Sequence, residues 1–179
     1  MVIEDTSRAT HSVHGQLTMI ELEKEGNMLT ANAPIHIERM ALTFNHDLPG
    51  FKGARHFTIE PLGEPEAPVF ASLKCSDPVF LDGDVALEKL VLLTMSPGAF
   101  WHDYEVHVND EMVAELDLSE PGDAALLVIV HPKQPLSDST VNLYSPIVYN
   151  RRTGAADQMV PAASEQEVGW SIRTPFPHD

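Results

Sequence analysis

The chain has 179 residues, of which 43% are hydrophobic, and this is enough to bury the core of one domain. Its 27 acidic and 11 basic side chains give a net charge of −16, which repels nucleic-acid phosphates and favours basic protein partners. The single cysteine excludes an internal disulfide, and no apolar run approaches the ~20 residues that cross a membrane. We therefore expect a cytoplasmic protein that binds neither membranes nor nucleic acid directly.

The first third of the chain predicts short strands separated by turns. Residues 1–12 are polar and lack periodicity. Strand-like patterns follow at 16–22, 28–30, 35–37, 42–44 and 57–61. Between the last two, Leu48-Pro49-Gly50 predicts a tight turn, because proline presets φ and glycine permits a positive φ. The prolines and glycine of 62–68 then predict a loop.

The middle of the chain predicts the most buried strands and one short helix. Apolar segments at 69–73, 90–95 and 125–130 are too short for buried helices, and the third is expected to be the central strand. One helical turn is expected at 85–89. Alternation over 104–108 places Tyr104 on one face and Glu105 on the other. Asn109 or Asp110 is expected to cap the short helix, with Met112, Val113 and Leu116 as its apolar stripe.

The segment from Thr140 to Asn150 gives the longest strand signal, because it is rich in β-branched and aromatic residues. Pro146 interrupts it, and since proline cannot donate to a β ladder, the strand lies at an edge or carries a bulge. A short edge-like strand is expected at 158–160. The total of eight to ten short strands and one helix is typical of an all-β barrel or sandwich.

The sequence contains no catalytic or metal-binding motif. It has no nucleophile elbow, no phosphate-binding glycine loop and, despite nine histidines, no Cys-x-x-Cys or His-Glu-x-x-His spacing. His46-Asp47 and His102-Asp103 are neighbouring pairs without a third ligand nearby in the sequence. Residues 82–84 lack the rest of a calcium loop and predict a solvated turn. We predict no enzymatic activity, no metal and no cofactor.

Residues 100–105 concentrate aromatic and acidic side chains. Interfaces favour large rings beside polar groups, and an acidic rim steers a basic partner. We predict that this segment binds a partner, with Glu105 as the most direct contact. The predicted partner-binding residues are Phe100, Trp101, Asp103, Tyr104 and Glu105. In the alternative interpretation, Phe100 and Tyr104 pack into the core and the acids merely face water.

Four segments, in this order, resemble the FliW family of bacterial flagellar assembly factors. They are Leu48-Pro49-Gly50-Phe51, the run from Ser96 to Glu105, the strand 140–150, and 170–176. The matching positions with an expected structural role are Leu48, Pro49, Gly50, Phe51, Asn142, Pro146, Asn150 and Arg173. The chain departs from the family pattern at Thr174, at 73–75 and in a longer loop within 76–90.

The resemblance implies a small, partly open β-barrel of short strands with one short helix. This domain would occupy 34–176, after a variable N-terminal extension at 1–33 with a possible first strand, and before a tail at 177–179. The resemblance also implies a non-enzymatic regulator, monomeric when free. It would bind CsrA, a dimeric RNA-binding repressor, relieve the repression of flagellin translation, and bind flagellin in a partner switch. The alternatives are a dedicated flagellin secretion chaperone and a small-molecule-binding barrel.

Overall fold

The computed structural model describes residues 27–31, 36–63, 68–82, 84–120, 122–160 and 171–177. The strand expected at 16–22 and the polar start at 1–12 lie outside these residues. The elements are β1 (Met28–Ala31), β2 (Met40–Phe44), β3 (His56–Leu62), β4 (Phe70–Cys75), β5 (Val79–Leu81), β6 (Val85–Leu87), β7 (Val91–Met95), η1 (Pro97–Ala99), β8 (Tyr104–His107), α1 (Asp110–Glu115), β9 (Ala124–His131), η2 (Leu136–Asp138), β10 (Thr140–Asn150), β11 (Ala155–Gln158) and β12 (Thr174–Pro175).

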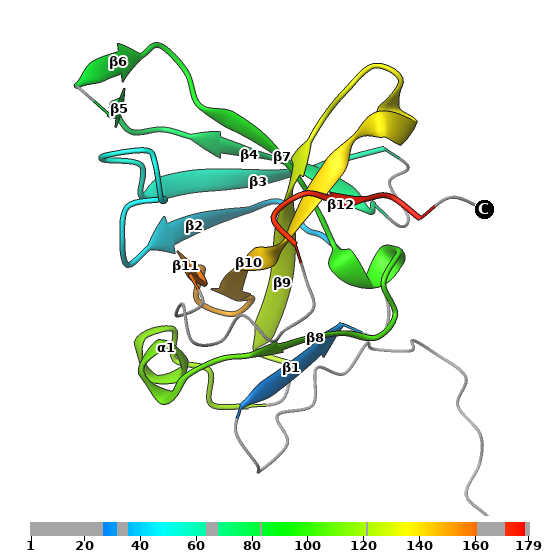
Figure 1. Cartoon of the computed structure of the whole chain (residues 1–179). Coiled ribbons are helices and arrows are strands. Elements are labelled where there is room, and N and C mark those ends of the chain that lie inside the picture. The colour runs from blue at the N-terminus through cyan, green and yellow to red at the C-terminus, as the bar shows by residue number, and fades with distance from the viewer. Residues whose placement is uncertain are drawn as a thin grey trace, which may run out of the picture.

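Seven strands form a barrel (Figure 1). Their order is β11-β2-β3-β4-β7-β9-β10, and β10 pairs back with β11 to complete the ring. All of these neighbours are antiparallel except β11 and β2, which pair in parallel over two positions, Thr43 with Ala155 and Phe44 with Ala156. The predicted small all-β barrel is therefore confirmed. The parallel seam between β11 and β2 pairs fewer residues than any other pair of neighbouring barrel strands.

The barrel interior is filled by side chains that alternate along each strand. The largest of these include Leu42, Phe44, Phe57, Ile59, Leu73, Leu127, Ile147 and Tyr149. The predicted tight turn is present at one end of the barrel. Gly50 has a φ of +84° and the Phe51 N–H donates to the Leu48 carbonyl at 2.8 Å. Leu48 is buried in the interior core, so the turn closes over the barrel.

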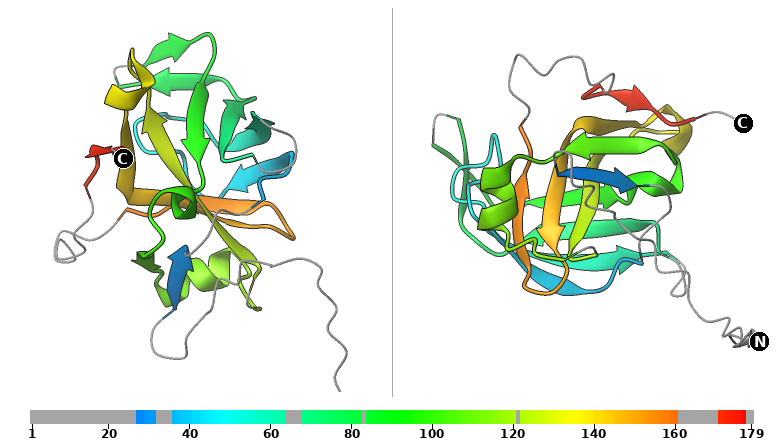
Figure 2. Two further views of the ribbon diagram at one scale, coloured as in Figure 1. Left: turned by 90° about the vertical axis from the view of Figure 1, so that its right-hand side faces the viewer. Right: turned by 90° about the horizontal axis from the view of Figure 1, so that it is seen from below.

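A second layer covers one outer wall of the barrel (Figure 2). It consists of the two-stranded sheet β1–β8 and helix α1. Asn109 caps α1 as predicted, since its side chain accepts a hydrogen bond from the Met112 N–H. The second core beneath this layer includes Leu29, Tyr104, Val106, Leu116, Leu126, Val128, Val141, Leu143 and Val148. Strand β1, which lies within the segment predicted as an extension with a possible first strand, contributes Leu29 and Ala31 to this core.

Strand β9 is buried on both faces, as expected for the central strand. Ala125 and Leu127 face the barrel interior, whereas Leu126, Val128 and Val130 face the second core. It pairs with β7 on one side and β10 on the other.

Strand β10 carries the predicted bulge. Between Asn142 and Ile147 it advances five residues, while β9 advances only from Ile129 to Leu127. An odd number of extra residues reverses the alternation of side chains. Consequently Val141 and Leu143 face the second core before the bulge, whereas Ile147 and Tyr149 face the barrel interior after it.

Local hydrogen bonds stabilise this bulge. The Asn142 side-chain oxygen accepts from the Ser145 N–H at 3.0 Å. The carbonyl of the buried Pro146 accepts from the Met159 N–H at 2.8 Å. An edge position for this strand is wrong, because β10 lies between β9 and the strands β11 and β12. The bulge accommodates the proline within a strand that has paired neighbours on both sides before and after it.

Three predictions for individual elements require correction. The helical turn expected at 85–89 is wrong, because β5 and β6 form an antiparallel hairpin whose turn includes Asp84 at a φ of +57°. The short strand expected at 158–160 occupies Ala155–Gln158, and it is enclosed by β10 and β2. Residues 36 and 37 lie outside any strand, although Ile37 is buried in the barrel core.

The buried side chain of Asn150 joins the end of β10 to α1 and to the turn before β11. Its amide nitrogen donates to the carbonyls of Leu116 (2.9 Å) and Asp117 (2.8 Å). Its oxygen accepts from the N–H groups of Arg152 (2.8 Å) and Thr153 (3.1 Å). One side chain therefore forms hydrogen bonds with two backbone carbonyls and two backbone N–H groups that are not paired within a helix or a sheet.

We expect Asn150→Ala to lower the free energy of unfolding by about 3 kcal/mol, because buried backbone groups lose their partners. Asn142→Ala removes a single, half-buried hydrogen bond and is the matched control, with an expected loss of about 1 kcal/mol. Equilibrium unfolding in urea measures both values. Equal losses in the two variants would contradict the central role assigned to Asn150.

Candidate functional site

The predicted interaction segment is a hydrogen-bonded turn between η1 and β8. Pro97 occupies the first position of η1, and its carbonyl accepts from the N–H groups of Phe100 (3.1 Å) and Trp101 (3.0 Å). The Tyr104 N–H then donates to the Trp101 carbonyl at 3.2 Å, where β8 begins. These bonds hold Phe100 and Trp101 on the outside of the turn.

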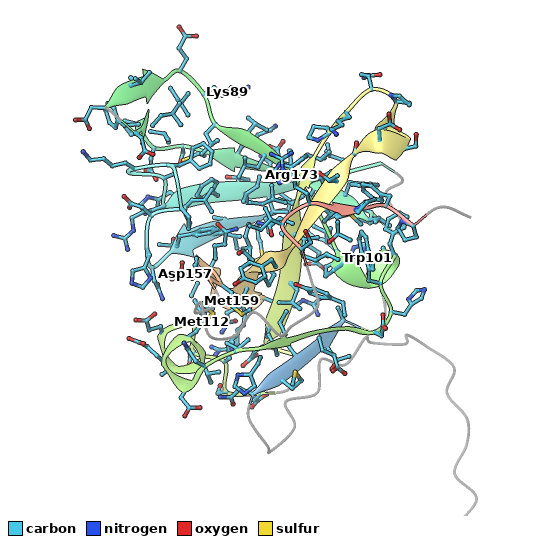
Figure 3. The ribbon with its side chains drawn as sticks, viewed as in Figure 1. Lys89, Trp101, Met112, Asp157, Met159 and Arg173 are labelled. Carbon is cyan, nitrogen blue, oxygen red and sulfur yellow. The ribbon has the colours of Figure 1, made fainter. Side chains whose placement is uncertain are left out.

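Phe100 and Trp101 belong to a cluster of four rings from three parts of the chain. Phe176, next to β12, packs edge-on against Phe100 with ring centroids 5.3 Å apart, and lies 6.0 Å from Trp101. Phe70 of β4 lies 6.5 Å from Phe100. Figure 3 shows Trp101 between η1 and β12. Phe100 remains 40% exposed, so this aromatic cluster (Phe70, Phe100, Trp101 and Phe176) presents an apolar ring to solvent.

Two acidic side chains of the same segment face solvent. Asp103 lies in the turn and Glu105 in β8, where Thr30 of β1 is its cross-strand partner. Neither carboxylate forms an ion pair with any residue that the structure describes. The aromatic cluster together with Asp103 and Glu105 is hereafter called the aromatic–acidic surface. Exposed anions and an exposed ring in the same segment match the chemistry of a basic partner.

Tyr104 lies away from this surface. It is fully buried in the second core, and its hydroxyl donates to the Leu143 carbonyl at 2.6 Å. Burial raises the pKa of Tyr104 above its usual value, so the phenol stays neutral. Its predicted role as a direct partner contact is therefore incompatible with the fold. Tyr104 instead attaches the interaction segment to β10.

The family-motif residues have mainly structural positions. Leu48, Phe51 and Asn150 pack or hydrogen-bond inside the fold, and Asn142 and Pro146 shape the bulge. Pro49 and Gly50 are exposed in the turn. Arg173 is also exposed, and its N–H donates to the Ser171 hydroxyl at 3.2 Å.

A groove of about 750 Å³ that sequence reasoning did not find opens beside the bulge of β10. Its lining is mainly apolar, with Phe51, Val91 and Ile129 among its walls. The Ser72 hydroxyl and the Nε2 atom of His131 also line it and have no hydrogen-bond partner among the residues that the structure describes. Burial, with a smaller contribution from Arg173, lowers the pKa of His131, so the groove has a neutral lining there.

The thiol of Cys75 does not suit nucleophilic catalysis. Burial raises its pKa, which keeps the sulfur protonated and unreactive. None of the described helices is both long and apolar enough to cross a membrane.

One cluster of side chains that could bind a metal ion, namely His46, Glu115 and Asp157, was not found from the sequence because its members are far apart in the chain.

Comparison with known proteins decides the family. The model of the FliW protein family matches residues 19–175. The chain belongs to the FliW family. The match begins within the segment predicted as a variable extension, in keeping with the place of β1 in the second core. FliW proteins are flagellar assembly factors and form a non-enzymatic family, which confirms the prediction that this protein is not an enzyme.

Curated FliW relatives share about a third of the aligned residues with this chain. The flagellar assembly factor FliW of Bacillus licheniformis is 31% identical over 123 residues, which cover 69% of this chain and 78% of the relative. That of Bacillus subtilis is 30% identical with the same coverage. A crystal structure of the flagellar assembly factor FliW superposes with a TM-score of 0.61 at 24% identity, covering 79% of this chain and 92% of that chain. This similarity shows that the two share a fold.

We expect Tyr104→Phe to lower the free energy of unfolding by about 1.5 kcal/mol, because the Leu143 carbonyl loses a buried donor. The loss should be independent of salt, since no charge is involved. Tyr144→Phe is the matched control, because the Tyr144 hydroxyl forms no hydrogen bond that the structure describes; its expected effect is below about 0.5 kcal/mol. Thermal and urea unfolding would contradict the anchoring role if the two variants behaved alike.

Proposed function

We propose that this FliW-family protein is a cytoplasmic regulator that binds CsrA and flagellin in a partner switch. In this scheme, binding to CsrA relieves its repression of flagellin translation, and free flagellin withdraws the regulator from CsrA. The observation that carries the proposal is the aromatic–acidic surface, in which one six-residue segment presents an exposed ring and two exposed carboxylates that have no ion-pair partners among the described residues. Family membership supports a role in flagellar assembly.

The geometry of the segment supports a binding role because several hydrogen bonds hold its backbone in place. The bonds to Pro97 hold the turn, and the Tyr104 hydroxyl attaches it to β10. A rigid surface loses little conformational entropy on binding, so more of its contact energy contributes to affinity. The exposed Phe100 ring supplies an apolar anchor of the kind that dominates interface energetics.

Charge supports CsrA as one of the partners. The resemblance to FliW proteins implies a partner with a basic RNA-binding surface, and this chain carries a net charge of −16. Asp103 and Glu105 increase the rate of encounter with such a surface. Once bound, the negative charge of the regulator also weakens RNA binding to CsrA, because phosphate binding depends on favourable electrostatics.

Glu105→Lys is expected to weaken CsrA binding at least tenfold at low salt, because a rim acid becomes a like charge facing a basic partner. The fold is expected to stay intact, since Glu105 is exposed. The loss should shrink between about 0.05 M and about 0.5 M salt, where screening removes the repulsion. Calorimetric titration with purified CsrA measures both effects.

Glu88→Lys is the matched control, because it makes the same charge change at an exposed residue after the β5–β6 hairpin, away from β8 (Figure 1). It should bind CsrA nearly as the wild type does. If Glu105→Lys binds CsrA like the wild type at low salt, the proposed surface is wrong.

Phe100→Ala tests the apolar part of the surface. We expect it to weaken binding of CsrA by about tenfold with little dependence on salt, because the lost contact is uncharged.

Titration of the wild-type protein with flagellin and with CsrA separately tests the main alternative, a dedicated flagellin secretion chaperone. Binding of flagellin without any binding of CsrA would assign the protein as a dedicated flagellin chaperone.

A further inference from the structure

Three side chains with metal-binding chemistry meet next to α1. His46 follows β2, Glu115 is the last residue of α1, and Asp157 belongs to β11. Their ligand atoms all lie within 4.8 Å of one another, and no other such group of three occurs among the described residues. His46 and Asp157 are 111 positions apart in the sequence, so only the fold brings them together.

Asn45 holds the three chain segments in place. Its backbone N–H donates to the Ala156 carbonyl at 3.0 Å, which aligns the residue before His46 with the residue before Asp157. Its side-chain amide donates to the Glu115 carbonyl at 3.2 Å. The ligand positions are thus set by hydrogen bonds that do not use the ligand atoms themselves. Such independent support is what a preorganised site requires.

The cluster combines a buried anchor with two accessible ligands. Asp157 is only 5% exposed; its Oδ1 atom accepts from the Gln158 N–H, and its Oδ2 atom lies 2.5 Å from Nδ1 of His46. Glu115 and His46 are exposed at a cleft of about 340 Å³ between the barrel and α1. Figure 3 shows Asp157 near Met112 of α1, and both residues line this cleft.

We propose that His46, Glu115 and Asp157 bind one divalent transition-metal ion of the zinc type. One imidazole nitrogen and two carboxylate oxygens are a suitable ligand set, and the cleft leaves the remaining positions to water. Since zinc lies about 2.0–2.2 Å from such ligands, His46 must withdraw slightly from Asp157, which its exposed position permits. The ion takes the place of the hydrogen bond between Nδ1 of His46 and Oδ2 of Asp157.

A second histidine–aspartate pair shows what distinguishes the site. Nδ1 of His56 lies 3.0 Å from Oδ1 of Asp77, and the imidazole is similarly exposed. Asp77 accepts from the backbone N–H groups of Arg55 and His56, and no third ligand completes a group there within the described residues. That pair has a local structural role. The third ligand, Glu115, is what makes the His46 cluster a metal site.

Titration of the full chain with Zn²⁺ tests the proposal. We expect one site in the wild type and at least a tenfold weaker affinity in both His46→Ala and Glu115→Gln. Both replaced side chains are exposed, so the variants should fold, as circular dichroism can verify. His56→Ala is the matched control and should bind Zn²⁺ as the wild type does, because it removes a histidine–aspartate pair without a third ligand.

Thermal unfolding gives a second measurement, because the ion would connect α1 to the barrel. Zinc at a hundredfold excess over its Kd should raise the Tm of the wild type and of His56→Ala by about 5 °C. At the same zinc concentration the Tm of Glu115→Gln should rise by about half as much at most, because a tenfold weaker affinity leaves only a tenfold excess over its Kd. The proposal is overturned if the wild type has no stoichiometric site, or if His46→Ala and Glu115→Gln bind zinc with unchanged affinity.

Discussion

Burial of β10 on both faces is the constraint on which the rest of the structure depends. The same strand forms a wall of the barrel interior and a wall of the second core. In a regular strand, the odd-numbered side chains would face one core and the even-numbered side chains the other along the whole length. The bulge between Asn142 and Ile147 reverses this assignment, so odd-numbered residues face the second core before it and the barrel interior after it. At the far end, Asn150 connects the strand to α1. The two cores are therefore expected to unfold together rather than as separate units.

Features that depend on neighbouring residues were predicted from the sequence, and features that depend on distant partners were not. The alternation of β8, the cap at Asn109 and the turn at Gly50 are local, and each is present. For β10 the sequence left an edge or a bulge open, because a proline permits either, and the pairing with β11 decides for the bulge. The helical turn at 85–89 was wrong because its pairing with β5 outweighs a weak local preference.

The same distinction applies to the candidate sites. Alternation alone places Glu105 and Tyr104 on opposite faces, and the structure agrees, although Tyr104 was also predicted to contact a partner and is instead buried. No sequence pattern indicates that Phe176 packs on Phe100, or that Glu115 and Asp157 lie beside His46. These contacts require the complete topology. The charge of the chain predicts a basic partner, but the position of the exposed ring follows only from the fold.

The parallel seam between β2 and β11 has a consequence for the order of events during synthesis. Thr43 leaves the ribosome long before its partner Ala155, so β2 has β3 on one side and no neighbour on the other until the residues of β11 have been synthesised. Non-local pairings of this kind form late because a long loop must close first. An unpaired strand edge is also a template for association with other chains. The nascent protein is thus most vulnerable to aggregation just before β11 emerges and completes the ring.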